Sequence, residues 1–338
     1  MSTAELDLGA LDAYLRERLP QIGHLRGADK FSDGQSNPTF LLHADSGDYV
    51  LRRQPPGELL RSAHAVDREF RVISALEHSE VPVPRALHLC EDRSVLGSLF
   101  FVMSHVPGRI FWDPTLPQLD QAERGAVYAE MNRVLAALHD IDIEAAGLAD
   151  FGRPGNYFER QVSRWSRQYQ ASEIEPIADM HRLIDWLPRN LPPDDGKVSL
   201  IHGDYRIDNM IFDAQGTSAL ALLDWELSTL GHPYADLAYQ CMQWRMARDC
   251  VLPGLGDIDR AALGIPDEQA YVDSYCQRRG LDAIDDWNFY LVFGFFRFAA
   301  ILQGVLKRAV DGNASSDKAF AYGALAPVLA RMAVELID

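Results

Sequence analysis

A short polar segment between apolar runs constrains the fold of this chain more than any other part of its sequence. Residues 202–209 read His-Gly-Asp-Tyr-Arg-Ile-Asp-Asn, and short apolar runs precede and follow them at 197–201, 210–212 and 220–223. The run Asp-Ala-Gln-Gly at 213–216 turns the chain between the last two runs, which predicts a β-hairpin. A loop and a hairpin of this kind bring an Asp, an Asn five positions later and a second Asp, Asp224, to one place.

These three residues have the layout that kinase-type phosphoryl transfer requires. One carboxylate must meet the attacking hydroxyl, while an amide oxygen and a second carboxylate hold magnesium against the phosphates of ATP. Oxygen donors suit Mg²⁺ because it is a hard cation. We therefore predict that Asp204 is catalytic, that Asn209 and Asp224 are metal ligands, and that the cofactors are ATP and Mg²⁺.

The same segment resembles the Brenner motif of the aminoglycoside phosphotransferase and choline kinase families, His-Gly-Asp followed by four residues and Asn. That motif is in turn similar to the catalytic loop of protein kinases. The resemblance implies an α+β, protein-kinase-like two-lobe fold, with a small antiparallel-sheet N-lobe and a larger, mainly helical C-lobe. Arg206 occupies the position of the kinase catalytic-loop Lys, where a cation offsets charge on the phosphoryl group. Aminoglycoside phosphotransferases often have His there, and we predict Arg206 as a catalytic helper.

Further matches lie in the N-terminal third. Residues 49–52, Tyr-Val-Leu-Arg, have the strand pattern of the kinase Val-Ala-Ile-Lys, so Arg52 is predicted to contact phosphate and Glu69 to pair with it. The alternative is an ordinary surface ion pair. Val-Leu-Arg followed by Pro-Pro-Gly at 55–57 resembles the phosphotransferase domains found alone in bacteria and fused to acyl-CoA dehydrogenases.

Two segments are candidates for nucleotide binding. The first occupies the position of a phosphate-covering loop, where backbone N–H groups cradle phosphate; its predicted residues are Gly34, Gln35, Ser36 and Asn37. The second, at 100–108, resembles the connection between kinase lobes, where backbone groups pair with the adenine edge. Its predicted residues are Met103, Ser104, His105 and Val106, although an apolar run of this kind is by itself simply a buried strand.

Hydrophobic periodicity predicts the elements around these motifs. Helices are expected at 5–19, 64–76, 126–139 and 158–170, and strands at 39–44, 49–53, 86–90, 99–104, 197–201, 210–212 and 220–223. The six regions before residue 105, four strands and two helices, form a mostly antiparallel lobe, and the later regions form a helical lobe. We predict an N-terminal nucleotide-binding lobe at 1–105 and a catalytic, substrate-binding lobe at 106–338.

Composition excludes several classes of partner. The chain carries 32 Lys and Arg against 49 Asp and Glu, a formal net charge of −17. This charge argues against a chain-wide nucleic-acid or anionic-membrane surface and does not exclude local basic patches. The start lacks signal-peptide features and the four cysteines show no CxxC spacing, so we expect a cytoplasmic protein with reduced thiols. Asn288, Arg297 and Gln303 interrupt the apolar stretch 287–306, which therefore predicts a buried core helix and no membrane span.

The predicted partner is a small molecule that carries a hydroxyl group. The subfamily resemblance favours a hydroxyacyl-CoA-type metabolite, whose charge a stripe of Arg160, Arg164 and Arg167 would match, unless that stripe is only a solvated helix face. An aminoglycoside is the alternative, for which only scattered acids are present: Asp257, Asp259, Asp267 and Glu268. An alternative of another class is a catalytically silent nucleotide-binding scaffold, which would be expected to lack one of Asp204, Asn209 and Asp224.

Asp236 resembles the family residue that braces the catalytic loop, although helix capping would also explain it.

Overall fold

The computed structural model describes residues 6–31, 37–55, 65–312 and 319–338. Its contacts divide the chain into two compact units, one comprising 1–110, 146–148 and 209–228 and the other 111–145, 149–208 and 229–338. Neither unit is continuous in sequence, whereas the predicted boundary at residue 105 assigned everything after it to one lobe. The two predicted domains themselves stay a prediction.

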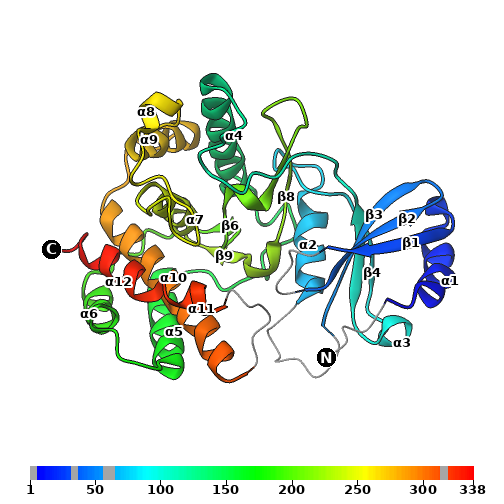
Figure 1. Cartoon of the computed structure of the whole chain (residues 1–338), viewed down its shortest axis with the longest axis horizontal. Coiled ribbons are helices and arrows are strands. Elements are labelled where there is room, and N and C mark those ends of the chain that lie inside the picture. The colour runs from blue at the N-terminus through cyan, green and yellow to red at the C-terminus, as the bar shows by residue number, and fades with distance from the viewer. Residues whose placement is uncertain (1–5, 32–36, 56–64, 313–318) are drawn as a thin grey trace. The chain divides into compact units, whose positions relative to one another are not determined.

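The first unit is built on a five-stranded antiparallel sheet of order β1-β2-β3-β5-β4 (Figure 1). Its strands are β1 (Leu25–Lys30), β2 (Thr39–Ala44), β3 (Gly47–Arg53), β4 (Ala86–Cys90) and β5 (Phe100–Ser104). Four of these match the predicted strands to within two residues. The edge strand β1 was not predicted, because Leu-Arg-Gly-Ala-Asp-Lys alternates weakly, and none of its six residues is buried.

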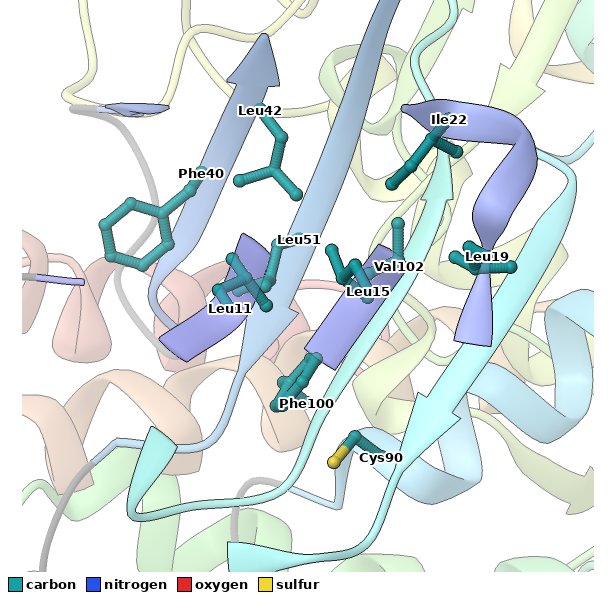
Figure 2. Close-up of a cluster of buried hydrophobic side chains, with 10 residues drawn as sticks. All are labelled: Leu11, Leu15, Leu19, Ile22, Phe40, Leu42, Leu51, Cys90, Phe100 and Val102. Carbon is teal, nitrogen blue, oxygen red and sulfur yellow. The ribbon is translucent and has the colours of Figure 1, made fainter. Parts of the chain in front are cut away.

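Two helices cover the two faces of this sheet. On one face, Leu11 and Leu15 of α1 (Leu8–Arg18) pack among buried strand residues that include Leu51, Phe100 and Val102 (Figure 2). On the other face lies α2 (Val66–Leu76), where the ring of Phe70 is 5.9 Å from that of Phe101. Neighbouring residues of β5 therefore face opposite helices, as the two-residue period of a strand requires.

A second hairpin belongs to the same unit. It consists of β7 (Met210–Phe212) and β8 (Ala219–Leu222), with Met210 opposite Leu222. Arg109 joins β7 through reciprocal backbone hydrogen bonds of 2.8 Å with Phe212, and its guanidinium donates to the carbonyls of Asp213 and Gly216 in the turn. The predicted hairpin is thus present, and it is fastened to the segment that follows β5.

The second unit is mainly helical and contains one short strand pair, β6 (Ser199–Ile201) with β9 (Thr229–Gly231). Its helices are α4 (Gln121–His139), α5 (Tyr157–Ser172), α6 (Ala178–Trp186), α7 (Tyr234–Cys241), α8 (Arg260–Leu263), α9 (Glu268–Arg279), α10 (Trp287–Val310), α11 (Ala319–Gly323) and α12 (Ala326–Val334). The remaining short helix, α3 (Arg93–Leu96), belongs to the first unit. The predicted α+β class, an antiparallel sheet followed by a helical region, is confirmed.

Helix α10 forms the centre of the helical unit, where it packs against α5, α7, α11 and α12. It is the one described helix long and apolar enough to cross a membrane, but 83% of its apolar window is buried inside the protein. The predicted core helix is therefore present. All four cysteines are unpaired thiols, and three of them are buried.

Candidate active site

The loop that carries Asp204 is pinned through its backbone. It leaves β6 and is held by the buried carboxylate of Asp236 in the first turn of α7, whose two oxygens accept the N–H groups of His202 (2.6 Å) and Gly203 (2.8 Å). Burial by itself would raise the pKa of Asp236, but hydrogen bonding from His139 and from these backbone groups holds it below its usual value. Gly203 has φ of 84°, a conformation that favours glycine.

Asp204 itself lies among hydrogen-bond donors and cations. The Tyr239 hydroxyl donates to its Oδ1 at 2.7 Å, and Nε of Arg206 is 3.8 Å from the same oxygen. Burial opposes ionisation of this carboxyl group, but Arg206 and the Tyr239 hydrogen bond outweigh burial and lower its pKa. Arg206 is held in turn by Asp208 at 2.5 Å. Asp204 is thus an ionised carboxylate at neutral pH, with its side chain 21% exposed.

The two predicted metal ligands belong to the first unit, where the hairpin brings them together. The carbonyl of Asn209 accepts the N–H of Leu223 at 2.8 Å, which places Asn209 and Asp224 at neighbouring ends of β7 and β8. Asp224 adopts a left-handed conformation, with φ of 62° and ψ of 59°, which is uncommon for a residue other than glycine. Strained backbone of this kind is concentrated at functional sites.

Arg52 meets three carboxylates rather than the one that was predicted. Its guanidinium lies 3.0 Å from Glu69 of α2, 2.6 Å from Asp224 and 3.5 Å from Glu226. Glu69 also accepts the side-chain amide of Asn37 at 3.0 Å. Burial raises the pKa of Glu69 to about 8; Arg52 partly offsets this effect, and the neighbouring carboxylates add to it.

This cluster suits a divalent cation. One guanidinium faces three carboxyl groups, so negative charge is in excess, and the amide oxygen of Asn209 is a further hard donor nearby in the same hairpin. Within the described ranges, no three His, Cys, Asp or Glu side chains are arranged to hold a metal on their own. This donor set fits Mg²⁺, which is usually bound by one or two protein oxygens together with substrate phosphates and water.

The predicted nucleotide-binding residues are only partly described. Gly34, Gln35 and Ser36 lie outside the described residues. Asn37 is buried, and its side chain holds Glu69. Met103 and Ser104 end β5, and the N–H of Ser104 already donates to the carbonyl of Arg85 at 2.9 Å. His105 and Val106 follow the strand and are half-buried. Their role as contacts to an adenine edge stays a prediction.

A groove of about 760 Å³ lies along the start of α5 in the helical unit. Arginines line it at Arg153, Arg160 and Arg167, whereas Arg164 of the predicted stripe lies 5.2 Å from the ring of Trp165 and does not line it. In the described part of the chain, none of these four arginines has a carboxylate within 4 Å, unlike Arg245 or Arg279. Two of the three predicted stripe residues therefore face one basic groove.

Tyr239 and Arg297 were not predicted from the sequence to belong to this site. Tyr239 follows Asp236 by three positions, so that one helical face presents both residues to the loop. Arg297 donates to the carbonyl of Gly203 at 2.7 Å. The sequence does contain a signal for Arg297, because a charged residue inside the apolar run 287–306 needs a buried partner.

Comparisons with known proteins agree with this picture. The model of the phosphotransferase enzyme family matches residues 28–283. Mouse acyl-CoA dehydrogenase family member 10 is 45% identical over 335 residues, which cover 98% of this chain and 31% of that protein. This chain therefore spans about a third of the length of that relative.

Solved structures share the fold. A protein from Ralstonia eutropha JMP134, named provisionally as an aminoglycoside phosphotransferase, is 48% identical, with a TM-score of 0.90 and 98% of both chains covered. A thermostable mutant of a further aminoglycoside phosphotransferase, in a ternary complex with ADP and hygromycin B, is 17% identical, with a TM-score of 0.63 and coverage of 97% and 98%. The predicted protein-kinase-like fold is confirmed.

Proposed function

Because this chain belongs to the phosphotransferase enzyme family, we propose that it transfers the terminal phosphoryl group of ATP, with Mg²⁺, to a hydroxyl group of a small molecule. The observation that carries the proposal is Asp204, an ionised carboxylate on a loop whose backbone a buried Asp236 holds rigid. Pre-organisation of this kind is the main contribution a protein makes to phosphoryl transfer.

Asp204 is assigned to the acceptor. Its carboxylate orients the hydroxyl group and receives the proton as the new O–P bond forms. The bond between the γ-phosphorus and the bridging oxygen breaks, and ADP leaves with that oxygen. Arg206, 3.8 Å from Asp204, is assigned to offset negative charge on the transferring group.

The first unit is assigned to the nucleotide. Asn209 and Asp224 would hold Mg²⁺, which when bound supplies positive charge to the β- and γ-phosphates. Arg52 would contact phosphate while Glu69 keeps its guanidinium in place at 3.0 Å. Gly34, Gln35, Ser36 and Asn37, together with Met103, Ser104, His105 and Val106, stay the proposed contacts to ATP.

For the acceptor we favour a hydroxyacyl-CoA-type metabolite. The phosphates of coenzyme A need basic partners. The groove at the start of α5 offers Arg153, Arg160 and Arg167, and these three cations outnumber the two carboxylates that line it, Glu159 and Asp194. The relatives named as acyl-CoA dehydrogenase family members support the same class. The chain's charge of −17 makes this local basic groove more notable.

An aminoglycoside is a weaker candidate because the acids that were considered for it serve the fold. Asp259 and Asp267 cap α8 and α9, Asp257 accepts the N–H of Arg248, and Glu268 pairs with Arg245. They form no open acidic cluster for several ammonium groups. A silent scaffold, the alternative of another class, is disfavoured because Asp204, Asn209 and Asp224 are all present.

The reaction is tested by slow ATP turnover in the wild type and in Asp204→Asn, with Asp282→Asn as the matched control. Asp282 is exposed, and no hydrogen bond or ion pair to another described residue involves it. We expect Asp204→Asn to lose at least 100-fold in turnover and the control to keep it. Turnover that survives in Asp204→Asn would remove the catalytic assignment, and absence of MgATP binding by the wild type would remove the kinase function.

The acceptor is tested by phosphate transfer to 3- and 4-hydroxyacyl-CoAs, aminoglycosides and choline-like alcohols. If the CoA class is correct, the double variant Arg160→Gln/Arg167→Gln raises KM for the thioester about tenfold or more. Arg164→Gln on the same helix, outside the groove, should leave KM unchanged. Transfer to an aminoglycoside but to no thioester would overturn the CoA proposal and leave the reaction type intact.

A further inference from the structure

Arg297 is a buried cation in an apolar helix. It lies in the middle of α10, is 8% exposed, and has no carboxylate within 4 Å among the described residues. A buried charge without a carboxylate partner is costly and calls for other compensation. Here the guanidinium donates to the carbonyl of Gly203 and lies 5.6 Å from the ring centre of Trp165 and 5.2 Å from that of Tyr239. Cation–π contacts of this kind become stronger when they are desolvated.

Tyr239 links this cation to Asp204. The centre of its ring lies 5.2 Å from the guanidinium carbon of Arg297, the residue is 6% exposed, and its hydroxyl donates to Asp204 Oδ1 at 2.7 Å. One turn earlier on α7, Asp236 holds the loop backbone. Helix α7 therefore fixes the backbone before Asp204 and also the carboxylate itself, while α10 fixes the carbonyl of Gly203.

We propose that Tyr239 and Arg297 are positioning residues for phosphoryl transfer: Tyr239 sets the orientation of the Asp204 carboxylate, and Arg297 holds both the Tyr239 ring and the loop. The proposal rests on the proposed role of Asp204. Neither residue needs to touch ATP or the acceptor, because each acts through Asp204. A carboxylate held in one rotamer meets the acceptor hydroxyl without a further loss of conformational entropy.

The groups that face Asp204 within its unit set its pKa and therefore the pH dependence of turnover. They are Arg206 and His202 of the loop, Tyr239 of α7 and Arg297 of α10, which all favour the ionised carboxylate against the effect of burial, and Asp208 of the loop, whose negative charge interacts unfavourably with that of Asp204. Burial holds the pKa of Tyr239 well above its usual value, so its hydroxyl keeps its proton and donates. Removal of that hydroxyl must raise the pKa of Asp204, because a hydrogen bond to the charged form is lost.

A purely structural role predicts something different. Loss of a buried hydroxyl that only supports packing lowers the melting temperature and leaves the pH dependence of turnover where it was. Tyr271 of α9 offers the matched control, because its buried hydroxyl donates to Gln240 Oε1 at 2.8 Å and does not contact Asp204. Both substitutions to Phe remove one buried hydroxyl and keep the ring.

The experiment measures kcat and KM for MgATP turnover against pH in the wild type, Tyr239→Phe, Tyr271→Phe and Arg297→Lys. We expect Tyr239→Phe to lower kcat roughly tenfold with KM for ATP nearly unchanged, and to move the acid limb of the profile to higher pH. Arg297→Lys, which keeps the charge but loses the planar stack, should show a smaller shift of the same sign. Tyr271→Phe should keep the wild-type profile.

Two outcomes overturn the proposal and can be told apart from failure of the reaction itself. An unshifted acid limb in Tyr239→Phe, while Asp204→Asn is inactive, removes the positioning role and leaves the function standing. An equal shift of the acid limb in Tyr271→Phe removes the positioning role as well, because the shift would then follow from the loss of any buried hydroxyl. If Asp204→Asn stays active, the proposed function fails and the positioning role fails with it. Tyr239→Phe keeps the ring that stacks on Arg297, so we expect it to fold.

Discussion

At the scale of single residues, the candidate site is a set of buried polar groups that share partners. Asp236 serves two backbone N–H groups, and Arg52 serves three carboxylates. An unpaired buried polar group costs about 1–3 kcal/mol and an unpaired charge costs more. The loss of any one partner should therefore lower the free energy of unfolding as well as the activity.

Asp236→Asn is expected to destabilise the protein by about 3 kcal/mol at pH 7, because hydrogen bonds to a charged acceptor become bonds to a neutral one. The pKa of Asp236 is lowered in the folded state. Its stabilisation is therefore complete above the ordinary value of 3.8 and is lost as pH falls through the lowered pKa. Urea unfolding should show that the free energies of unfolding of the wild type and Asp236→Asn differ less below pH 3.8 than at pH 7. A gap that stays constant would contradict the account.

Arg52→Gln is expected to lower the free energy of unfolding by about 1–3 kcal/mol, because it leaves Asp224 and Glu226 without the largely buried cation that they face at 2.6 and 3.5 Å. The matched control is Arg26→Gln. The partner of Arg26, Asp45, lies 2.8 Å away, within the range of the Arg52 distances, but the side chain of Arg26 is 72% exposed. Exposed pairs contribute below about 1 kcal/mol. Equal losses in the two variants, measured by urea unfolding at pH 7, would show that burial is not the reason.

At the scale of elements, short strands and tight approaches position the chemistry. The hairpin β7–β8 has strands of only three and four residues, and it depends on its contact with the segment after β5. Gly108 lies in that segment. A Cβ atom there would lie 2.4 Å from the carbonyl oxygen of Phe212 and 2.4 Å from Cγ2 of Ile211, so only glycine fits.

Gly108→Ala should therefore lower the free energy of unfolding by about 1–3 kcal/mol through overpacking. It should also weaken nucleotide binding, because the hairpin that carries Asn209 and Asp224 is displaced. Gly9→Ala in α1 is the control, since the nearest atom to its Cβ would be 3.6 Å away and alanine favours a helix by up to about 1 kcal/mol. Thermal unfolding with and without ADP measures both effects, and an unaffected Gly108→Ala would refute the steric argument.

At the scale of the whole molecule, the proposed catalytic residues are divided between two units that alternate along the chain. Asp204 belongs to the helical unit and Asn209 to the sheet unit, and the boundary falls between residues 208 and 209. A ligand that binds only the folded chain stabilises it by mass action, about 2.7 kcal/mol at a hundredfold excess over Kd. Binding can thus be followed as stability, independently of turnover.

We expect Mg²⁺ to increase the stabilisation that ADP gives to the wild type, and Asp224→Asn to abolish this increment while leaving the metal-free effect of ADP. The reason is that an amide is a weaker ligand than a carboxylate for a hard cation. Asp213→Asn in the turn of the same hairpin is the control, because the Asp213 carboxylate accepts the N–H groups of Gln215 and Gly216 and no others among the described residues. A full Mg²⁺ increment in Asp224→Asn would remove Asp224 as a ligand.

The sequence by itself determined what depends on local spacing. Asp204 and Asn209 lie five residues apart, and a turn separates β7 from β8. Apolar periods predicted five of the twelve described α-helices, α1, α2, α4, α5 and α10, and four of the five strands of the sheet. These features can be recognised in the sequence because the interacting groups are near neighbours in the chain. The Arg52–Glu69 pair was predicted from a resemblance, and the structure added Asp224 and Glu226 to it.

Only the tertiary structure decided which distant groups complete the site. Tyr239 reaches Asp204 across 35 positions, Arg297 reaches Gly203 across 94, and Asn37 reaches Glu69 across 32. The physical reason is that a buried polar group must find a partner wherever the fold places one. Arg297 could be recognised in the sequence as a charge that needs compensation, but its partner follows only from the packing of α10 against α5 and α7.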